Sequence, residues 1–222
     1  MKMNNATPQQ ATVISHTEVA PGVFILRFTR PADQHFKAGQ MVWVRYPTQG
    51  PARLYSIASG ENEPFYEIIY NVVKEGALTP TLSQVKVGET IWISHPAGKF
   101  TSAGNPAVWI ATGTGIAPFA SMVRSGFTAE TLLIQGGRDK NSFYYQDIFN
   151  QTNNLAYVKC MSRKQAEGYF HGRVTHFIEN EYQPLPHRQH LLCGSAEMVV
   201  EVRDLLIRKG IPYQNIVSEI YF

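Results

Sequence analysis

The hydrophobic residues of this chain follow one period in its first half and another in its second. Up to Phe100 they form short runs rich in β-branched and aromatic residues, separated by clusters of Pro, Gly and Asn. The runs cover residues 23–28, 41–46, 65–73 and 90–93. Short strands at this spacing are typical of an antiparallel barrel or sandwich. One short helix is expected among them, with Thr79 as N-cap and Pro80 at the first helical position.

After Phe100, buried-strand patterns alternate with helical patterns. Strands are expected at 107–111, 131–135, 156–161 and 189–193, and helices at 118–124, 144–150, 173–179 and 196–209. This alternation is typical of a doubly wound, mostly parallel sheet. We therefore predict two domains. Residues 1–103 would form an antiparallel β-barrel, and residues 104–222 an α/β domain with a parallel sheet.

Composition excludes several classes of protein. With 44% hydrophobic and 17% charged residues, the 222-residue chain is globular rather than disordered. A net charge of +3 is too mild to indicate nucleic-acid binding, but suits an acidic protein partner. Cys160 and Cys193 cannot supply the four thiolates of an iron–sulfur cluster or a disulfide framework. No apolar run has membrane-spanning length, so we predict a cytoplasmic protein. No metal site is predicted, because His187 and His190 have the spacing of a weak metal pair but lack further ligands.

The stretch Arg53-Leu54-Tyr55-Ser56 offers a cation, an aromatic ring and a hydroxyl within four residues. On a strand, Arg53 and Tyr55 would share one face, with Ser56 on the other or at the strand end. A guanidinium can hold a phosphate, a ring can stack on a flat heterocycle, and a hydroxyl can bond a ring nitrogen. Alone, these residues suit an ordinary edge strand as well as a flavin nucleotide site.

The turn Gly76-Ala77-Leu78-Thr79 precedes the short helix expected in the first half. Backbone N–H groups of such a turn, together with a helix N-terminus, can bind an anion. With Arg53, the turn would hold a pyrophosphate from two sides, which favours FAD over FMN. The alternative interpretation is a plain strand-to-helix connection.

The segment Thr112-Gly113-Thr114-Gly115-Ile116-Ala117-Pro118 directly follows the first strand expected in the second half. Glycines let the backbone approach a pyrophosphate, and the next helix aims its N–H groups at the negative charge. The third glycine of the usual dinucleotide fingerprint is replaced by Pro118, so an ordinary strand-to-helix turn is the alternative. Within a strand–helix alternation, the motif favours a dinucleotide site.

Arg138 follows the second strand expected in the second half, Arg163 follows the third, and Arg173 opens the next helix. Ligands of such sheets bind at the carboxyl ends of the strands, and clustered arginines with Ser162 suit a ribose 2′-phosphate. This pattern favours NADP over NAD. Asp139 could instead accept a bond from a ribose 2′-hydroxyl, and each arginine alone also suits a solvated surface charge.

Cys193-Gly194-Ser195 ends the fourth strand of the second half, and the chain itself ends in Tyr221-Phe222. A small thiol followed by glycine leaves room for a nicotinamide ring, although a buried structural cysteine is the alternative. A nucleophilic role for Cys193 is not favoured, since no histidine is adjacent. The terminal aromatic residues either pack on the core or cover a flat cofactor by stacking.

These motifs, in this order, resemble the ferredoxin–NADP(+) reductase family, and its short bacterial type most closely. The resemblance spans Gly39-Gln40 to Phe222 and departs at Phe222, where the relatives carry Trp. It implies a flavoprotein oxidoreductase with FAD and NADP(H) as cofactors, which transfers hydride between NADPH and N5 of FAD. Single electrons would pass to or from ferredoxin or flavodoxin, acidic carriers that dock through Lys and Arg. A monomer is expected.

The resemblance also implies roles for individual residues. The implied FAD site consists of Arg53, Leu54, Tyr55, Ser56, Ile69, Ala77, Leu78, Thr79, Thr114, Tyr221 and Phe222. The implied NADP site consists of Thr114, Gly137, Arg138, Ser162, Arg163, Arg173, Gly194, Ser195 and Met198. Four residues are implied near the reacting atoms: Ser56, Cys193, Glu219 and Tyr221. Ser56 and Glu219 would serve N5, and Tyr221 would be a movable cover opposite Tyr55.

Two other functions remain open on the same scaffold. One is an NAD(P)H-dependent flavin reductase or the electron-transfer component of an oxygenase. Arg53 and the turn at Gly76 argue against a flavin reductase that releases its flavin, because such an enzyme needs no grip on a pyrophosphate. The other is a non-catalytic regulatory subunit that senses flavin and nucleotide. The intact flavin and arginine motifs argue against that subunit.

Overall fold

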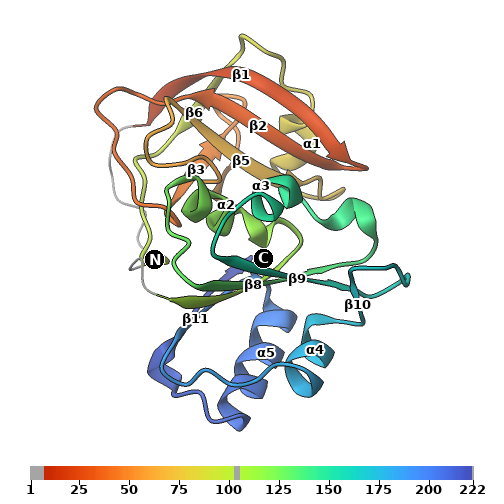
Figure 1. The fold of residues 1–222 in the computed structure, drawn as a ribbon. Coiled ribbons are helices and arrows are strands. Elements are labelled where there is room, and N and C mark those ends of the chain that lie inside the picture. Colours follow the sequence, from red (N-terminus) through yellow and green to blue (C-terminus); the bar gives the residue numbers. More distant parts are fainter. Residues whose placement is uncertain (1–7, 103–105, 222) are drawn as a thin grey trace. The chain divides into compact units, whose positions relative to one another are not determined.

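The computed structural model describes residues 8–102 and 106–221, which fall into two compact units (Figure 1). The N-terminal unit ends at Thr101, and the C-terminal unit begins at Ser102. Each unit contains one six-stranded sheet, with antiparallel pairing in the first and parallel pairing in the second. The predicted combination of an antiparallel barrel with a doubly wound parallel sheet is confirmed.

The sheet of the N-terminal unit has the strand order β4-β3-β6-β1-β2-β5. Its elements are β1 (Gln9–Ala20), β2 (Val23–Thr29), β3 (Met41–Arg45), β4 (Ala52–Ser56), β5 (Phe65–Asn71), α1 (Thr79–Leu82) and β6 (Thr90–Ile93). Just after the edge strand β4, the backbone N–H of Ala58 donates to the carbonyl of Glu67 on the opposite edge strand, at 2.7 Å. The two edges therefore meet, and the sheet curls into a barrel.

Strand β1 is the element of the N-terminal unit that the sequence pattern missed. It has 12 residues and pairs with both β2 and β6. Its register against β2 shifts between Val13 and Ser15 and again between Glu18 and Ala20. A bulge inserts an extra residue, so the alternation of buried and exposed side chains is not continuous along β1. The period that predicts a strand is therefore absent from its sequence.

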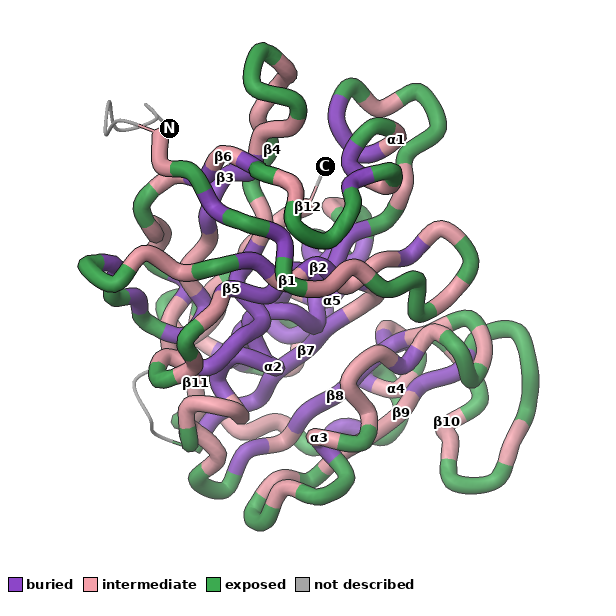
Figure 2. The backbone as a smooth tube through the Cα atoms, turned by 90° about the horizontal axis from the view of Figure 1, so that it is seen from above, coloured by how far each residue is buried: buried purple, intermediate pink, exposed green. Residues whose placement is uncertain are grey.

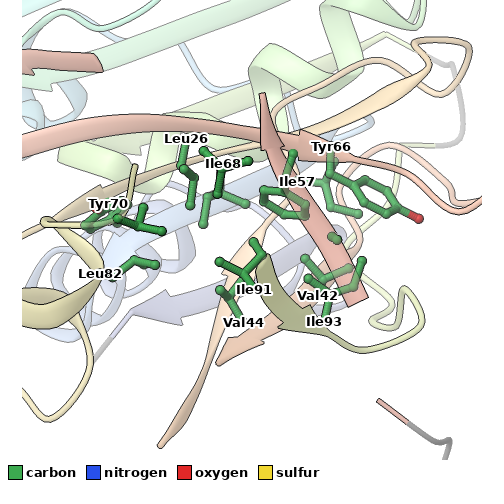
Figure 3. Close-up of a cluster of buried hydrophobic side chains, with 14 of the residues drawn as sticks. Leu26, Val42, Val44, Ile57, Tyr66, Ile68, Tyr70, Leu82, Ile91 and Ile93 are labelled. Atoms are coloured by element: carbon green, nitrogen blue, oxygen red, sulfur yellow. The ribbon is translucent and has the colours of Figure 1, made fainter. Parts of the chain in front are cut away.

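The core of the barrel is formed by side chains that point inward from several strands (Figure 3). Tyr66, Ile68 and Tyr70 lie on one face of β5 and belong to this core, while Glu67 and Ile69 on the other face are buried too. Leu82 of α1 and Ile91 of β6 pack into the same cluster. Burying each such aliphatic side chain stabilises the fold by about 1.5–3 kcal/mol. The barrel thus gives β4 and β5 a rigid support.

The sheet of the C-terminal unit has the order β10-β9-β8-β7-β11-β12. Its strands are β7 (Ala107–Thr112), β8 (Thr131–Gly137), β9 (Leu155–Met161), β10 (Phe170–His171), β11 (Gln189–Ser195) and β12 (Ile216–Tyr221). The chain starts in the middle of the sheet, runs to one edge, and returns at β11 to build the other. The strand order therefore reverses between β7 and β11, and ligands of such sheets bind at the carboxyl ends of these strands.

Helices cover both faces of this parallel sheet (Figure 1). Helices α2 (Ala117–Arg124) and α3 (Gln146–Asn150) lie on one face, and α4 (Val174–Asn180) and α5 (Ala196–Arg208) on the other. The central strands β7 and β8 are mostly buried (Figure 2), as strands covered on both faces must be. Of the helices within residues 8–102 and 106–221, none is long and apolar enough to cross a membrane.

A buried histidine joins β11 to the loop before it. His190 is fully buried, and its Nε2 lies 2.7 Å from the Tyr182 hydroxyl. Its Nδ1 lies 3.0 Å from the carbonyl oxygen of Arg188. A carbonyl can only accept, so Nδ1 carries the proton and the Tyr182 hydroxyl donates to Nε2. Burial lowers the pKa of His190 to about 4, although the bond to the Arg188 carbonyl acts in the opposite direction.

We expect the protein to lose stability through His190 as the pH falls from 6.5 towards 4. The unfolded chain protonates His190 near its ordinary pKa of about 6.5, so in this window the unfolded state binds more protons. Thermal unfolding at pH 7 and pH 5 measures the loss. His190→Asn should show a smaller loss than the wild type, whereas His95→Asn, at an exposed position, should match the wild type. Equal losses in all three proteins would contradict this expectation.

Candidate functional site

Arg53 lies on the edge strand β4 with an exposed side chain. Its Nη1 donates to the carbonyl of the adjacent Ala52 at 2.9 Å. Among the described residues, no carboxylate forms an ion pair with it. A guanidinium carries five N–H donors, so most of its capacity is available to an anion.

Tyr55 stands on the same strand, opposite Val42 of β3, with its ring against the barrel core. The ring centroid lies 6.0 Å from that of Tyr70, at an interplanar angle of 62°. Burial raises the pKa of the Tyr55 hydroxyl to about 12, against a smaller opposite effect of the Arg53 charge. The hydroxyl is buried and has no hydrogen-bond partner among the described residues. Such orphaned groups are rare, and this one fits a polar group of a bound cofactor.

The turn after β5 leaves backbone donors available. Val73 N donates to the Thr79 hydroxyl oxygen at 2.9 Å, and Gly76 N donates to the Val73 carbonyl at 2.8 Å. A Cβ at Gly76 would lie 2.9 Å from that carbonyl oxygen, so the turn requires glycine. No hydrogen bond among the described residues uses the N–H groups of Ala77 and Leu78. The turn is therefore suited to an anion.

One detail of this turn differs from the prediction. The N-cap of α1 is Leu78 rather than Thr79, and the Thr79 hydroxyl serves Val73 instead. The side chain of Leu78 is buried and anchors the turn to the barrel core. Ser56, at the end of β4, and Ile69, on β5, are also buried. Of the residues predicted for FAD, eight belong to the N-terminal unit, and the structure gathers them on β4, β5 and this turn.

The ends of β7 and β11 approach each other very closely. A Cβ at Gly115 would lie 2.3 Å from the carbonyl oxygen of Cys193, and one at Gly194 would lie 2.5 Å from the Thr112 hydroxyl oxygen. Gly115 and Gly194 thus allow the loop after β7 to contact the end of β11, at the point where the strand order reverses. Thr114 is buried in the short 3-10 helix Gly113–Ile116 that leads into α2.

Two of the predicted NADP loops are joined by backbone hydrogen bonds. Ser162 N donates to the carbonyl of Gly137 at 3.0 Å, and Arg163 N donates to the carbonyl of Arg138 at 3.0 Å. Both arginine side chains are exposed. The carboxyl ends of β8 and β9 therefore bring two guanidinium groups and a hydroxyl to one edge of the sheet. This arrangement suits a phosphate.

Arg173 and Asp139 are the two other charged residues considered for the NADP site. Arg173 is the N-cap residue of α4, and its Nη1 lies 3.8 Å from Oε1 of Glu197, with both side chains exposed. Such an exposed pair is weak and can open for an anion. The Asp139 carboxylate accepts from Asn141 N at 3.0 Å and from the Ser142 hydroxyl at 3.2 Å. Because the Asp139 carboxylate already accepts hydrogen bonds from its own loop, a bond to it from a ribose 2′-hydroxyl is not favoured.

Strands β11 and β12 place the Cys193 motif beside the C-terminal residues. Cys193 pairs with Glu219, and Ser195 pairs with Tyr221. Burial raises the pKa of the Cys193 thiol well above its usual range, and the Glu219 charge adds to this effect. A thiol that stays protonated is no nucleophile. The structure therefore does not favour a nucleophilic role for Cys193, in agreement with the prediction.

Ser195 and Met198, also predicted for the NADP site, have structural roles in the C-terminal unit. The Ser195 hydroxyl accepts from Met198 N at 3.4 Å and caps α5, and Met198 is buried in the core of the C-terminal unit. Phe222 lies outside the described residues. Sequence motifs gave no sign of Tyr70, which supports the ring of Tyr55. The available signal was the place of Tyr70 in the predicted strand 65–73, on the same face as Tyr66 and Ile68.

Comparison with known proteins identifies the family. A model for the oxidoreductase FAD-binding domain matches residues 10–102, and one for the oxidoreductase NAD-binding domain matches residues 109–204. A ferredoxin–NADP reductase of Pseudomonas aeruginosa is 31% identical over 221 residues, covering 85% of this chain and 85% of that protein. The phenol hydroxylase P5 protein of Acinetobacter pittii is 28% identical over 230 residues, covering 95% of this chain but 64% of that protein.

A solved structure shares the whole fold. The crystal structure of a ferredoxin NADP+ reductase from Neisseria gonorrhoeae, with bound FAD and NADP, matches with a TM-score of 0.86. It covers 98% of this chain and 100% of that chain, at 22% identity. The predicted family, its oxidoreductase class and its cofactors FAD and NADP(H) are confirmed. This chain belongs to the ferredoxin–NADP reductase family of flavoprotein oxidoreductases.

Proposed function

We propose that this protein is a ferredoxin/flavodoxin–NADP(+) reductase. The observation that carries the proposal is the pairing of the Arg138 and Arg163 loops at the sheet edge where a ribose 2′-phosphate would bind. Residues 1–103 would be the FAD-binding domain and residues 104–222 the NADP(H)-binding domain. The carrier would be a ferredoxin or flavodoxin with an acidic surface, which suits the net charge of +3. Monomeric state and cytoplasmic location stay predictions.

The N-terminal unit would hold FAD through four kinds of contact. Arg53 would grip the pyrophosphate from one side, and the N–H groups of Ala77 and Leu78 from the other. The Tyr55 ring would stack on one face of the isoalloxazine. Ser56 would donate a hydrogen bond near N5. When bound, FAD supplies the exchange between two-electron and one-electron chemistry, and these residues only orient it.

The C-terminal unit would bind the nicotinamide nucleotide and shape the reaction space. The proposed contacts are Thr114, Gly137, Arg138, Ser162, Arg163, Arg173, Gly194, Ser195 and Met198. Cys193 would leave room for the nicotinamide ring. Glu219 would hold a proton near the reacting atoms. Tyr221 would cover the other flavin face and move aside when the nicotinamide enters.

Electron transfer to a carrier tests the proposal directly. The purified protein should stay yellow through gel filtration and should reduce a dye acceptor with NADPH. It should then reduce a ferredoxin or a flavodoxin with NADPH, at a rate that falls as the ionic strength rises. If the protein reduces the dye but no ferredoxin or flavodoxin, the proposed electron carrier is wrong. The assignment as a flavoprotein oxidoreductase would still hold.

A second candidate is the reductase component of an oxygenase. The observation that favours it is the similarity to the phenol hydroxylase P5 protein over 95% of this chain. The acceptor separates the two functions, because such a component would pass electrons to an oxygenase partner rather than to a free small carrier. A non-catalytic regulatory subunit would show no dye reduction at all.

Arg163→Ala should weaken the binding of NADPH about tenfold, which is the worth of a charge-assisted hydrogen bond of about 1.5 kcal/mol. Reduction of the flavin by NADH should not change, because NADH has no 2′-phosphate. Stopped-flow bleaching of the flavin with both nucleotides measures the effect. Arg208→Ala removes an exposed charge at the end of α5 and should alter neither rate. An equal loss with NADH would contradict the 2′-phosphate site.

A further inference from the structure

We propose that His16 is a positioning residue for the flavin, which fixes the hydroxyl of Tyr70 and, through the Tyr70 ring, the orientation of Tyr55. The inference rests on the proposed function, because it takes Tyr55 as the ring that stacks on the isoalloxazine. His16 belongs to β1, the strand that carries no cofactor motif. The contact between these residues arises only when β1, β4 and β5 come together in the barrel.

The two ring nitrogens of His16 have different partners. Nδ1 lies 3.0 Å from the carbonyl oxygen of Val85, and Nε2 lies 2.8 Å from the Tyr70 hydroxyl. A carbonyl oxygen can only accept, so Nδ1 must carry the proton. Nε2 is then the acceptor, and the Tyr70 hydroxyl donates to it. One chain of hydrogen bonds therefore runs from Tyr70 through His16 to Val85.

Tyr70 is held at both ends. Its hydroxyl bonds His16, while its ring meets Phe24 at a centroid distance of 5.7 Å and Tyr55 at 6.0 Å. Both distances lie in the range of favourable aromatic contacts. Only 2% of Tyr70 is exposed, so its ring cannot turn into solvent. A hydroxyl anchored by His16 therefore sets the angle at which the Tyr70 ring meets Tyr55.

The same histidine also reaches the segment that follows the proposed pyrophosphate turn. Val85 lies just after α1, and its N–H donates to the Leu82 carbonyl at 3.1 Å. The turn at residues 76–79 leads directly into this helix. His16 thus connects the aromatic wall and the phosphate-binding turn of the FAD site. A change at His16 should be felt at the flavin, although the side chain does not touch it.

The environment favours the neutral imidazole that this geometry needs. Burial lowers the pKa of His16 below its ordinary value, and the Val85 carbonyl acts in the opposite direction. A protonated imidazole would donate from both nitrogens, and the Tyr70 hydroxyl would lose its acceptor. The ring of Phe24 covers the imidazole at a centroid distance of 4.8 Å, which helps to exclude water.

Two substitutions of His16 separate its two bonds. His16→Gln places an amide where Nε2 stands, so it keeps an acceptor for the Tyr70 hydroxyl and loses the bond to Val85. His16→Asn places an amide where Nδ1 stands, so it keeps the bond to Val85 and loses the one to Tyr70. If His16 acts through Tyr70, the Gln variant should resemble the wild type and the Asn variant should not.

Two buried tyrosines on the same strand give a matched pair. Tyr70→Phe removes the hydroxyl that bonds His16, and Tyr66→Phe removes one that donates to the Gln34 side chain at 2.8 Å. Both rings face the barrel core, at opposite ends of the cluster (Figure 3). Each change leaves the ring in place and deletes one buried hydrogen bond. The pair therefore separates a loss of barrel stability from an effect on Tyr55.

The measurements are the dissociation constant of FAD from the full-length protein and the visible circular dichroism of the bound flavin. We expect His16→Asn and Tyr70→Phe to weaken FAD binding about fivefold, the equivalent of one buried hydrogen bond, and to change the dichroism of the flavin. His16→Gln and Tyr66→Phe should keep the wild-type dichroism. The proposal is overturned if Tyr66→Phe alters the flavin as much as Tyr70→Phe, or if the Gln and Asn variants behave alike.

Tyr55→Leu separates the proposed role of His16 from the proposed function on which it rests, the stacking of Tyr55 on the flavin. If the Leu variant changes the flavin dichroism while His16→Asn and Tyr70→Phe do not, the stacking role of Tyr55 stands and the role of His16 falls. If the Leu variant leaves the dichroism unchanged, Tyr55 does not stack on the flavin and both assignments fail. Should His16→Asn not fold, the comparison of Tyr70→Phe with Tyr66→Phe decides the matter alone.

Discussion

Gly115→Ala should destabilise the C-terminal unit by about 3 kcal/mol, at the upper end of the cost of overpacking. The new Cβ would lie 2.3 Å from the carbonyl oxygen of Cys193 and 2.8 Å from Cα of Gly194. These are backbone atoms, so they cannot rotate away as a flexible side chain would. Either the loop after β7 or the end of β11 must move, and NADPH binding should be lost with the shape of the site.

Gly113→Ala is the matched control in the same loop. Gly113 has a φ of 56°, but a Cβ there would meet nothing within 4 Å. The substitution should cost only the left-handed backbone strain of a non-glycine residue, about 1–2 kcal/mol. Urea unfolding of both variants, together with NADPH titration, measures the difference. A loss in Gly115→Ala no larger than that in Gly113→Ala would contradict the expected cost of overpacking at the two strand ends.

Arg53→Ala should weaken the binding of FAD about a hundredfold. A pyrophosphate carries two negative charges, and charge-assisted hydrogen bonds are worth up to about 3 kcal/mol. The exposed Arg53 side chain has no carboxylate partner among the described residues, so its removal leaves no buried charge unpaired. The fold should therefore stay intact. Thermal unfolding of the apoprotein should be near that of the wild type while the dissociation constant of FAD rises.

Two further variants serve as controls for the loss of FAD affinity in Arg53→Ala. Lys86→Ala removes the same amount of charge from the surface of the same unit and should leave FAD binding unchanged. Arg53→Lys keeps the charge and loses the planar fork, so its affinity for FAD should fall between those of Arg53→Ala and the wild type. If Lys86→Ala weakens FAD binding as much as Arg53→Ala, the effect is one of net charge and not of a specific grip.

Much of the fold was predictable because its signals are local. The buried strands of the C-terminal unit are short apolar runs, and α5 shows its buried face at Val199, Val202 and Leu206. In the N-terminal unit the same holds for β2, β3, β5 and β6. Strand β1 was not predictable, because its bulges break the alternation, and β10 has only two residues. Both exist through their pairing with strands that have clear patterns.

The candidate site also contains residues that local motifs predict and residues whose contacts they do not predict. Arg53, Tyr55 and the glycine of the turn at Gly76 each stand in a short motif whose chemistry can be read from neighbouring residues. Thr79 shows the limit of such reasoning, since its hydroxyl caps no helix and bonds Val73 across the turn. The sequence also left open whether Asp139 binds a ribose, and the bonds within its loop weigh against that role.

By itself, the sequence determined the two-domain architecture, the family and the cofactors, since these depend on periodicity and on contiguous motifs. Only the tertiary structure decided which distant residues meet. A backbone hydrogen bond between two loops joins Arg138 to Arg163, and strand pairing joins Cys193 to Glu219. The closing of the barrel brings His16 to Tyr70 across 54 residues. The physical reason is that register and close packing depend on the whole sheet. No short window of sequence contains the partner of a side chain that lies on another strand.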